Sequence, residues 1–247
     1  MKRYMILFIL ILLLSACTDT SSKGSSNNNN RKWRSGSEGI TMKYVDDSPP
    51  TELVSTQDLN VMVEYTNKGA YNLDKGNLKF YLSGYDPTIF TGIKGSEKVG
   101  DSLEGKNQFN DKGSQKEFEQ WTSAIDLSGI PTVDSFSTDL TVTACYEYKT
   151  IATPSVCIDP QKYDQIISNR CQYSIKDLGS NQGAPIAVSK VEKKTSDDSV
   201  IFEIYIRNVG KGIPFSTKGI DNCHNSLSIK DINTVKLESI KVSNVEF

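Results

Sequence analysis

Two segments of the chain alternate apolar and polar residues, and this pattern constrains the fold more than any other feature. Residues 59–66 and 200–207 each keep their apolar side chains at every second position. Successive side chains of a β-strand point to opposite faces, so a period of two predicts strands with one buried face. Each segment ends in Asn-x-Gly, as Asn67-Lys68-Gly69 and Asn208-Val209-Gly210. Both motifs predict a sharp turn in which glycine takes a positive φ.

These two segments form an internal repeat. Placing Asn67 on Asn208 aligns Val61, Val63 and Tyr65 with Phe202, Ile204 and Ile206, and Gly69 with Gly210. A further strand is predicted before each, at residues 40–45 and 186–191. The pattern predicts an all-β fold of two tandem immunoglobulin-like antiparallel β-sandwich modules. We place a first module at 37–160, a connector at 161–182 and a second module at 183–247. The second module has 65 residues, against about 100 for a full sandwich, so it is short or incomplete.

Other strands are predicted from shorter signals. Apolar and β-branched residues predict strands at 78–82, 140–148, 155–158, 226–229 and 235–245. The strand at 155–158 follows Pro154 and is expected to form a hairpin with 140–148. Residues 116–127 fit a helix or a strand, and we favour a strand because they lack a wide apolar stripe. Residues 92–114 are polar and glycine-rich, which predicts a loop.

The first 17 residues have the layout of a secretory signal. Lys2 and Arg3 precede an apolar run at 5–14, which ends in Leu-Ser-Ala-Cys17. The run is shorter than the roughly 20 residues that cross a bilayer. Leu-Ser-Ala-Cys resembles the lipobox of prokaryotic lipoproteins, and this resemblance implies a signal peptide at 1–16 and a lipid on Cys17. The alternative is an ordinary signal peptide followed by a chance cysteine. Residues 17–36 contain one aromatic residue, Trp33, and show no apolar periodicity, which predicts a disordered tether.

Four cysteines remain after Cys17, and an oxidising compartment allows them two disulfides with three possible connectivities. Cys145 and Cys157 flank a turn centred on residues 150–152, and a hairpin there sets them opposite each other. We therefore predict a Cys145–Cys157 bridge, which leaves Cys171 with Cys223. Free buried cysteines are one alternative. A four-cysteine zinc site is another, although its usual CxxC pairs are absent.

The sequence carries little catalytic chemistry, and we predict no enzyme activity, no cofactor and no metal. The single histidine, His224, follows Cys223, and neighbours on a strand point to opposite faces, so we expect a surface residue. The net charge is −2, and positive and negative residues are interspersed along the chain. This argues against a nucleic-acid-binding protein, which usually carries a clustered basic face. Tyr71 and Tyr85, if exposed, are candidate binding anchors. Calcium is an alternative occupant of three acidic clusters, at residues 46–47, 117–119 and 197–198.

The repeat resembles a known group of modules. Residues 61–69 (VMVEYTNKG) and 202–210 (FEIYIRNVG) are similar to cell-adhesion-related, CARDB-like and other immunoglobulin-like modules of prokaryotic, especially archaeal, surface proteins. The first module also resembles envelope lipoproteins of small-genome archaea, through residues 46–50 (DDSPP), 82–87 (LSGYDP), 144–148 (ACYEY) and 156–160 (VCIDP). The resemblance covers residues 38–215, and the second module departs from it by being brief.

These observations predict a non-catalytic, lipid-anchored cell-surface protein. Its partners are the membrane, through the lipid on Cys17, and another envelope protein or a glycan, and its modules act as binding units or spacers. One alternative is an accessory subunit of an extracellular enzyme complex. Another is a solute-binding lipoprotein, which usually needs two α/β lobes that this chain does not suggest.

Overall fold

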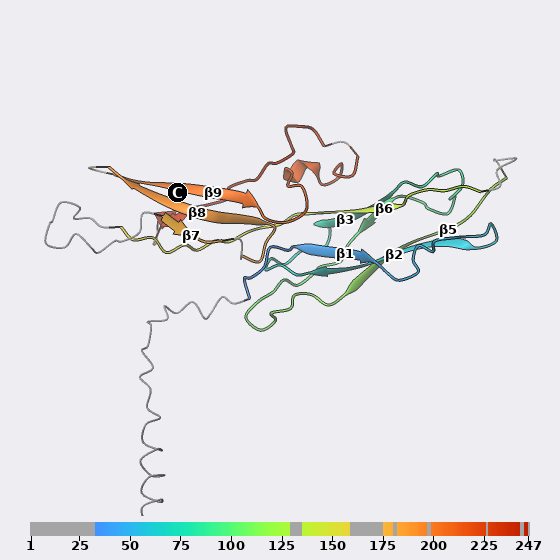
Figure 1. Cartoon of the computed structure of the whole chain (residues 1–247), viewed down its shortest axis with the longest axis horizontal. Helices are drawn as coiled ribbons and strands as arrows, with labels where there is room; N and C mark the ends of the chain where they lie inside the picture. Colours follow the sequence, from blue (N-terminus) through green and yellow to red (C-terminus); the bar gives the residue numbers. More distant parts are fainter. Residues whose placement is uncertain are drawn as a thin grey trace, which may run out of the picture. The chain divides into compact units, whose positions relative to one another are not determined.

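The computed structural model describes residues 33–128, 135–158, 175–179, 182–196, 199–225, 227–242 and 245–246. They belong to one compact unit, residues 31–247. This unit is all-β: a single turn of 3-10 helix, η3 (Thr217–Gly219), accompanies strands that pair antiparallel throughout the described residues (Figure 1). The predicted fold class is therefore confirmed. No helix in these ranges is long and apolar enough to cross a membrane. The predicted signal peptide at 1–16 and the predicted lipidation site Cys17 lie outside the described residues.

The first module contains two three-stranded sheets. One has the order β1-β2-β5, with β1 (Ile40–Tyr44), β2 (Asp58–Asn67) and β5 (Glu117–Ala124). The other has the order β4-β3-β6, with β3 (Leu78–Ser83), β4 (Glu97–Val99) and β6 (Thr141–Tyr146). The strand over the ambiguous segment 116–127 is thus confirmed. The loop predicted at 92–114 is interrupted by β4, which is too short to produce a detectable alternation.

The two sheets share one hydrophobic core. The face predicted from alternation on β2 is buried, with Val61, Val63 and Tyr65 at 0, 1 and 2 % exposure. These side chains belong to the same cluster as Leu78, Phe80 and Leu82 of β3. The rings of Tyr65 and Phe80 meet at a centroid distance of 4.5 Å. Burying one such side chain stabilises the fold by about 1.5–3 kcal/mol, so this contact between sheets holds the sandwich together.

A third sheet has the order β7-β8-β9, with β7 (Ile175–Asp177), β8 (Ile186–Thr195) and β9 (Val200–Asn208). Figure 1 shows β8 and β9 as one long hairpin, and its register shifts between Val188 and Lys190. β7 lies within the segment that we expected to be a connector. A terminal pair follows, β10 (Lys241–Val242) with β11 (Val245–Glu246).

Three of the weaker strand predictions fail. Residues 155–158 form no strand, and neither do the described residues 227–229. The strand predicted at 235–245 is reduced to the short β10–β11 pair. The segment 155–158 is only four residues long and follows Pro154, which has no N–H to donate to a ladder.

The internal repeat extends to strand pairing. Ile40 is the register partner of Asn67 in β1–β2, and Ile186 is the partner of Asn208 in β8–β9. The next residue bonds back in both copies: the Lys68 N–H to the Gly39 carbonyl at 2.9 Å, and the Val209 N–H to the Pro185 carbonyl at 2.8 Å. β8–β9 therefore repeats the geometry of β1–β2 at its Asn-x-Gly end.

The buried tyrosines make the fold sensitive to alkali. Burial raises the pKa of Tyr65 from 10.0 to about 12, and it also raises the pKa of Tyr146 and of Tyr148. The folded state favours the neutral phenol, so this stabilisation is full below pH 10 and is lost as pH rises through the folded pKa. We expect the free energy of unfolding, measured in urea, to fall between pH 10 and about 12. Tyr65→Phe should flatten part of this fall, and an unchanged slope would contradict the assignment.

Candidate binding groove

The two Asn-x-Gly motifs make the same hydrogen bonds. The Asn67 Oδ1 accepts from the Gly69 N–H at 3.1 Å, and its Nδ2 donates to the Tyr71 carbonyl at 2.7 Å. The Asn208 Oδ1 accepts from the Gly210 N–H at 3.1 Å, and its Nδ2 donates to the Gly212 carbonyl at 2.7 Å. Each asparagine thus fixes the four residues after its strand, as short polar side chains do in turns.

The role predicted for the two glycines is wrong. Neither Gly69 nor Gly210 has a positive φ. A Cβ at Gly69 would instead overlap the Tyr148 hydroxyl and lie 2.7 Å from the Glu38 carbonyl oxygen, and one at Gly210 would lie 2.7 Å from the Pro185 Cβ. Glycine is required at both positions because another part of the chain approaches the backbone closely, a use of glycine that sequence alone does not distinguish from a turn.

The two copies of the repeat differ in how deeply their apolar faces are buried. Phe202, Ile204 and Ile206 occupy the positions of the buried β2 face, yet Phe202 is half-buried, and Ile204 and Ile206 are 37 and 43 % exposed. In the first module the sheet β4-β3-β6 covers this face. Among the described residues, no second sheet covers it on β9. The face of β9 that repeats the buried face of β2 is therefore open at Ile204 and Ile206.

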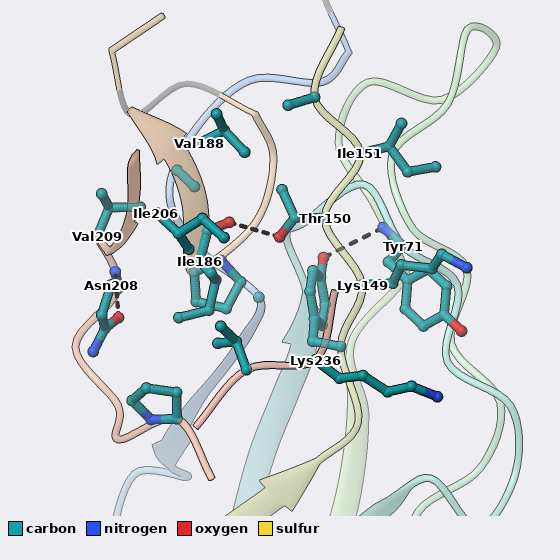
Figure 2. A pocket seen from close by; sticks show the side chains of 18 of the residues that line it. Tyr71, Lys149, Thr150, Ile151, Ile186, Val188, Ile206, Asn208, Val209 and Lys236 are labelled. Carbon is teal, nitrogen blue, oxygen red and sulfur yellow. Dashed lines mark hydrogen bonds between the residues drawn. The ribbon is translucent and has the colours of Figure 1, made fainter. Parts of the chain in front are cut away.

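This open face is one wall of a large groove. The other walls come from residues 36–42, 149–156 and 234–242. Figure 2 shows Ile151 on one side of Thr150, with Val188 and Ile206 on the other. Several aliphatic side chains in the groove are at least one-third exposed, namely Ile151, Ile204, Ile206, Ile213, Val235 and Leu237. The groove measures about 2270 Å³, against roughly 300–1,000 Å³ for small-molecule pockets. It has the size and the openness of a surface for a macromolecule.

The groove floor is tied to the first module by hydrogen bonds. The Thr150 Oγ1 donates to the Ile186 carbonyl at 2.6 Å. The Tyr148 hydroxyl donates to the Gly183 carbonyl and accepts from the Tyr71 N–H, both at 3.3 Å. The Gly183 carbonyl also accepts from the Ala70 N–H at 2.7 Å. These bonds fix the start of β8 against the first module.

Charged side chains of both signs line the groove. Lys149 forms an ion pair with Glu238. The hydrogen bond between them raises the pKa of Lys149 and lowers the pKa of Glu238. Both side chains are exposed, so solvent screens the pair and its contribution to stability is small. The pair links the wall at 149–156 to the wall at 234–242.

The predicted disulfide pairing is wrong. Cys145 is bonded to Cys223, 78 residues away, with a Cα–Cα distance of 6.4 Å. The predicted bridges to Cys157 and from Cys171 to Cys223 are therefore both excluded. Because residues 155–158 form no strand, Cys157 does not lie opposite Cys145. Cys157 is also disulfide-bonded, and Cys171 lies outside the described residues.

Peptide mapping without reductant should find the peptide containing Cys145 linked to the one containing Cys223. If Cys17 carries a lipid, Cys171 is the cysteine left for Cys157, and those two peptides should also be linked. Reduction should separate both pairs and serves as the control. A peptide linking Cys145 to Cys157 would contradict the structure.

The Cys145–Cys223 bridge is part of a docked loop, residues 220–225. The His224 ring stacks on Tyr81 of β3 at a centroid distance of 3.9 Å. The Tyr81 hydroxyl donates to the Ile220 carbonyl at 3.1 Å, and Lys79 pairs with Asp221 as well as with Glu97. His224 is thus half-buried rather than the surface residue we expected. Sequence reasoning missed this contact because its partner is more than 140 positions away.

The remaining candidate residues do not assemble into a reactive site. Tyr71 and Tyr85 pack against the core of the first module, although Tyr71 also lines the groove. Asp46 and Asp47 are exposed on a turn, and the pair at 197–198 lies outside the described residues. Within the described ranges, no group of His, Cys, Asp and Glu side chains is arranged to hold a metal.

Comparisons with known proteins found no relative of this chain. No protein-family model, curated protein or solved structure matches this chain.

Proposed function

We propose that this chain is a non-catalytic, lipid-anchored cell-surface protein whose groove binds another protein of the cell envelope. The observation that carries this proposal is the open apolar face of β9 at Ile204 and Ile206. The same face is a buried core in the first module, and exposed apolar surface of this kind marks interaction sites. The first module then acts as the rigid support that holds the groove.

The chemistry of the groove favours a protein partner over a glycan. Its exposed large hydrophobic side chains are all aliphatic, namely isoleucine, valine and leucine. Such side chains bury the apolar side chains of a protein segment, whereas sugars need many polar groups. The size and openness of the groove also fit an extended segment better than a small solute.

The surface location rests on the first 17 residues. Mass spectrometry of the N-terminal peptide should show a lipid on Cys17, and the protein should partition into detergent. Cys17→Ser should abolish both, while Cys157→Ser, a change at a cysteine beyond the tether, should leave them intact. An unmodified Cys17 in a protein that stays in the aqueous phase would overturn the anchor.

The groove is tested by a photo-crosslinking residue at Ile151, in cells that make the protein. Ile151 is 47 % exposed and lines the groove, and Phe109 is 90 % exposed and lies outside it. We expect one discrete adduct from position 151, none from position 109, and loss of the first adduct when Ile206→Lys places a charge in the groove. Equal adducts from both positions, or an adduct that survives Ile206→Lys, would overturn the proposal.

A further inference from the structure

β9 is the open edge of its sheet. Among the described residues its one paired neighbour is β8. The Val209 N–H points toward β8, where it bonds to the Pro185 carbonyl. Backbone groups alternate sides along a strand. The N–H and C=O groups of Phe202, Ile204 and Ile206 therefore point away from β8.

The internal repeat shows what occupies this edge in the first module. The equivalent edge of β2 pairs with β5, with Val61 opposite Trp121 and Tyr65 opposite Glu117. The second module has no counterpart of β5 in the described residues, so the β9 edge lacks the strand that its own repeat provides. A nine-residue strand with free backbone groups is a template for another strand.

Apart from the charged side chains of Glu203 and Arg207, the edge carries none of the usual protection against pairing. Natural edges are blunted by proline, by bulges, by inward charges or by being short. β9 contains no proline, and the register irregularity of the hairpin lies on β8. Its apolar residues Ile201 and Ile206 remain 55 and 43 % exposed. The strand is therefore suited to receive a partner.

We propose that the β9 edge pairs antiparallel with β9 of a second copy of this chain, across a two-fold axis at Tyr205. Antiparallel pairing of identical edges is a closed, isologous contact, so it forms dimers rather than fibres. The two three-stranded sheets then join into one six-stranded sheet.

Charge complementarity selects this register. With Tyr205 on the axis, Glu203 lies directly opposite Arg207 of the other copy, twice per dimer. Within one chain, no described carboxylate forms an ion pair with Arg207. Glu203 and Arg207 lie on the same face of β9, opposite the face that lines the groove. Opposite charges at facing positions stabilise a strand pair, and like charges destabilise it.

The apolar residues match in the same register. Ile204 faces Ile206 of the other copy on the groove side, and Ile201 faces Val209 on the opposite side. The neighbouring register, centred on Ile204, would instead place Ile201 against Arg207 and leave Glu203 against Tyr205. Registers are distinguished by such pairs, since a shift changes every partner.

Disulfide trapping in the full chain, in mild detergent, tests the contact directly. The backbone N–H and C=O groups of the odd-numbered residues of β9 point toward β8. In the dimer, Tyr205 and its copy therefore form a non-hydrogen-bonded pair, with Cα atoms about 4.5 Å apart. This distance permits a disulfide. Tyr205→Cys should give a covalent dimer on mild oxidation. Ile201→Cys, on the same face, should not, because its own copy lies about 26 Å away along the strand. Equal trapping at both positions, or none at position 205, would overturn the proposal.

A charge exchange tests the register in solution. Light scattering of the purified chain should give the mass of a dimer at micromolar concentration. Arg207→Glu and Glu203→Arg should each weaken dimerisation by about tenfold, since each places like charges at two facing positions. The double exchange should restore it, which a variant that merely fails to fold would not do. A wild-type monomer at all concentrations, or single variants as dimeric as wild type, would overturn the proposal.

Discussion

Removal of the Cys145–Cys223 disulfide is expected to lower the free energy of unfolding by about 4 kcal/mol. The bridge closes a loop of 78 residues. In the chain-entropy account, opening a loop of that length gives the unfolded chain freedom worth about 4 kcal/mol. The double variant Cys145→Ala and Cys223→Ala removes the bridge and keeps the buried position of Cys145 apolar. Urea unfolding at neutral pH measures the difference.

The matching control is a change in the docked loop that keeps the bridge. Tyr81→Phe removes the hydrogen bond to Ile220 and leaves the ring stacked on His224, so we expect a loss of about 1 kcal/mol. Peptide mapping should confirm that Cys157 stays bonded in both variants. If the double alanine variant lost no more than Tyr81→Phe, the bridge would not constrain the unfolded chain as argued.

Asn67→Ala is expected to lower the free energy of unfolding by about 3 kcal/mol. Asn67 is fully buried and satisfies the Gly69 N–H and the Tyr71 carbonyl. Alanine leaves both groups without a partner, and each buried unsatisfied group costs about 1–3 kcal/mol. Urea unfolding measures this loss, and intact disulfides in the variant keep the comparison valid.

Asn208→Ala is the internal control, because Asn208 makes the same two hydrogen bonds at the same distances. Asn208 is exposed, so water can replace its side chain. We expect a loss of less than about 1 kcal/mol. Equal losses at the two positions would mean that burial does not separate the two copies of the repeat.

The period of two was sufficient to predict the main strands and the fold class. Alternation at Val61, Val63 and Tyr65, and again at Phe202, Ile204 and Ile206, marks an apolar face without saying what covers it. Whether the face is buried depends on another sheet packing against it, and the alternation pattern does not predict where that sheet lies. The same pattern therefore became a buried core in one module and an open groove wall in the other.

The predictions for the disulfides and for the two glycines were wrong for a different reason. The predicted Cys145–Cys157 bridge relied on local hairpin geometry, whereas the bond to Cys223 joins segments 78 residues apart. Glycine is required at position 69 because the hydroxyl of Tyr148, from a distant part of the chain, lies against its backbone. Contacts between distant segments determine both the disulfide pairing and the need for glycine, and the local sequence pattern carries no information about such contacts.

The most direct test of the groove is the reactivity of a thiol on one of its walls. Ile151→Cys should react with a bulky, water-soluble maleimide rapidly in the purified protein, because Ile151 is 47 % exposed and lies away from the β9 edge. In cells, where the proposed partner fills the groove, the same thiol should react about tenfold more slowly, the ratio expected if some nine in ten molecules are occupied. Equal rates in the two settings would contradict a groove that binds an envelope protein.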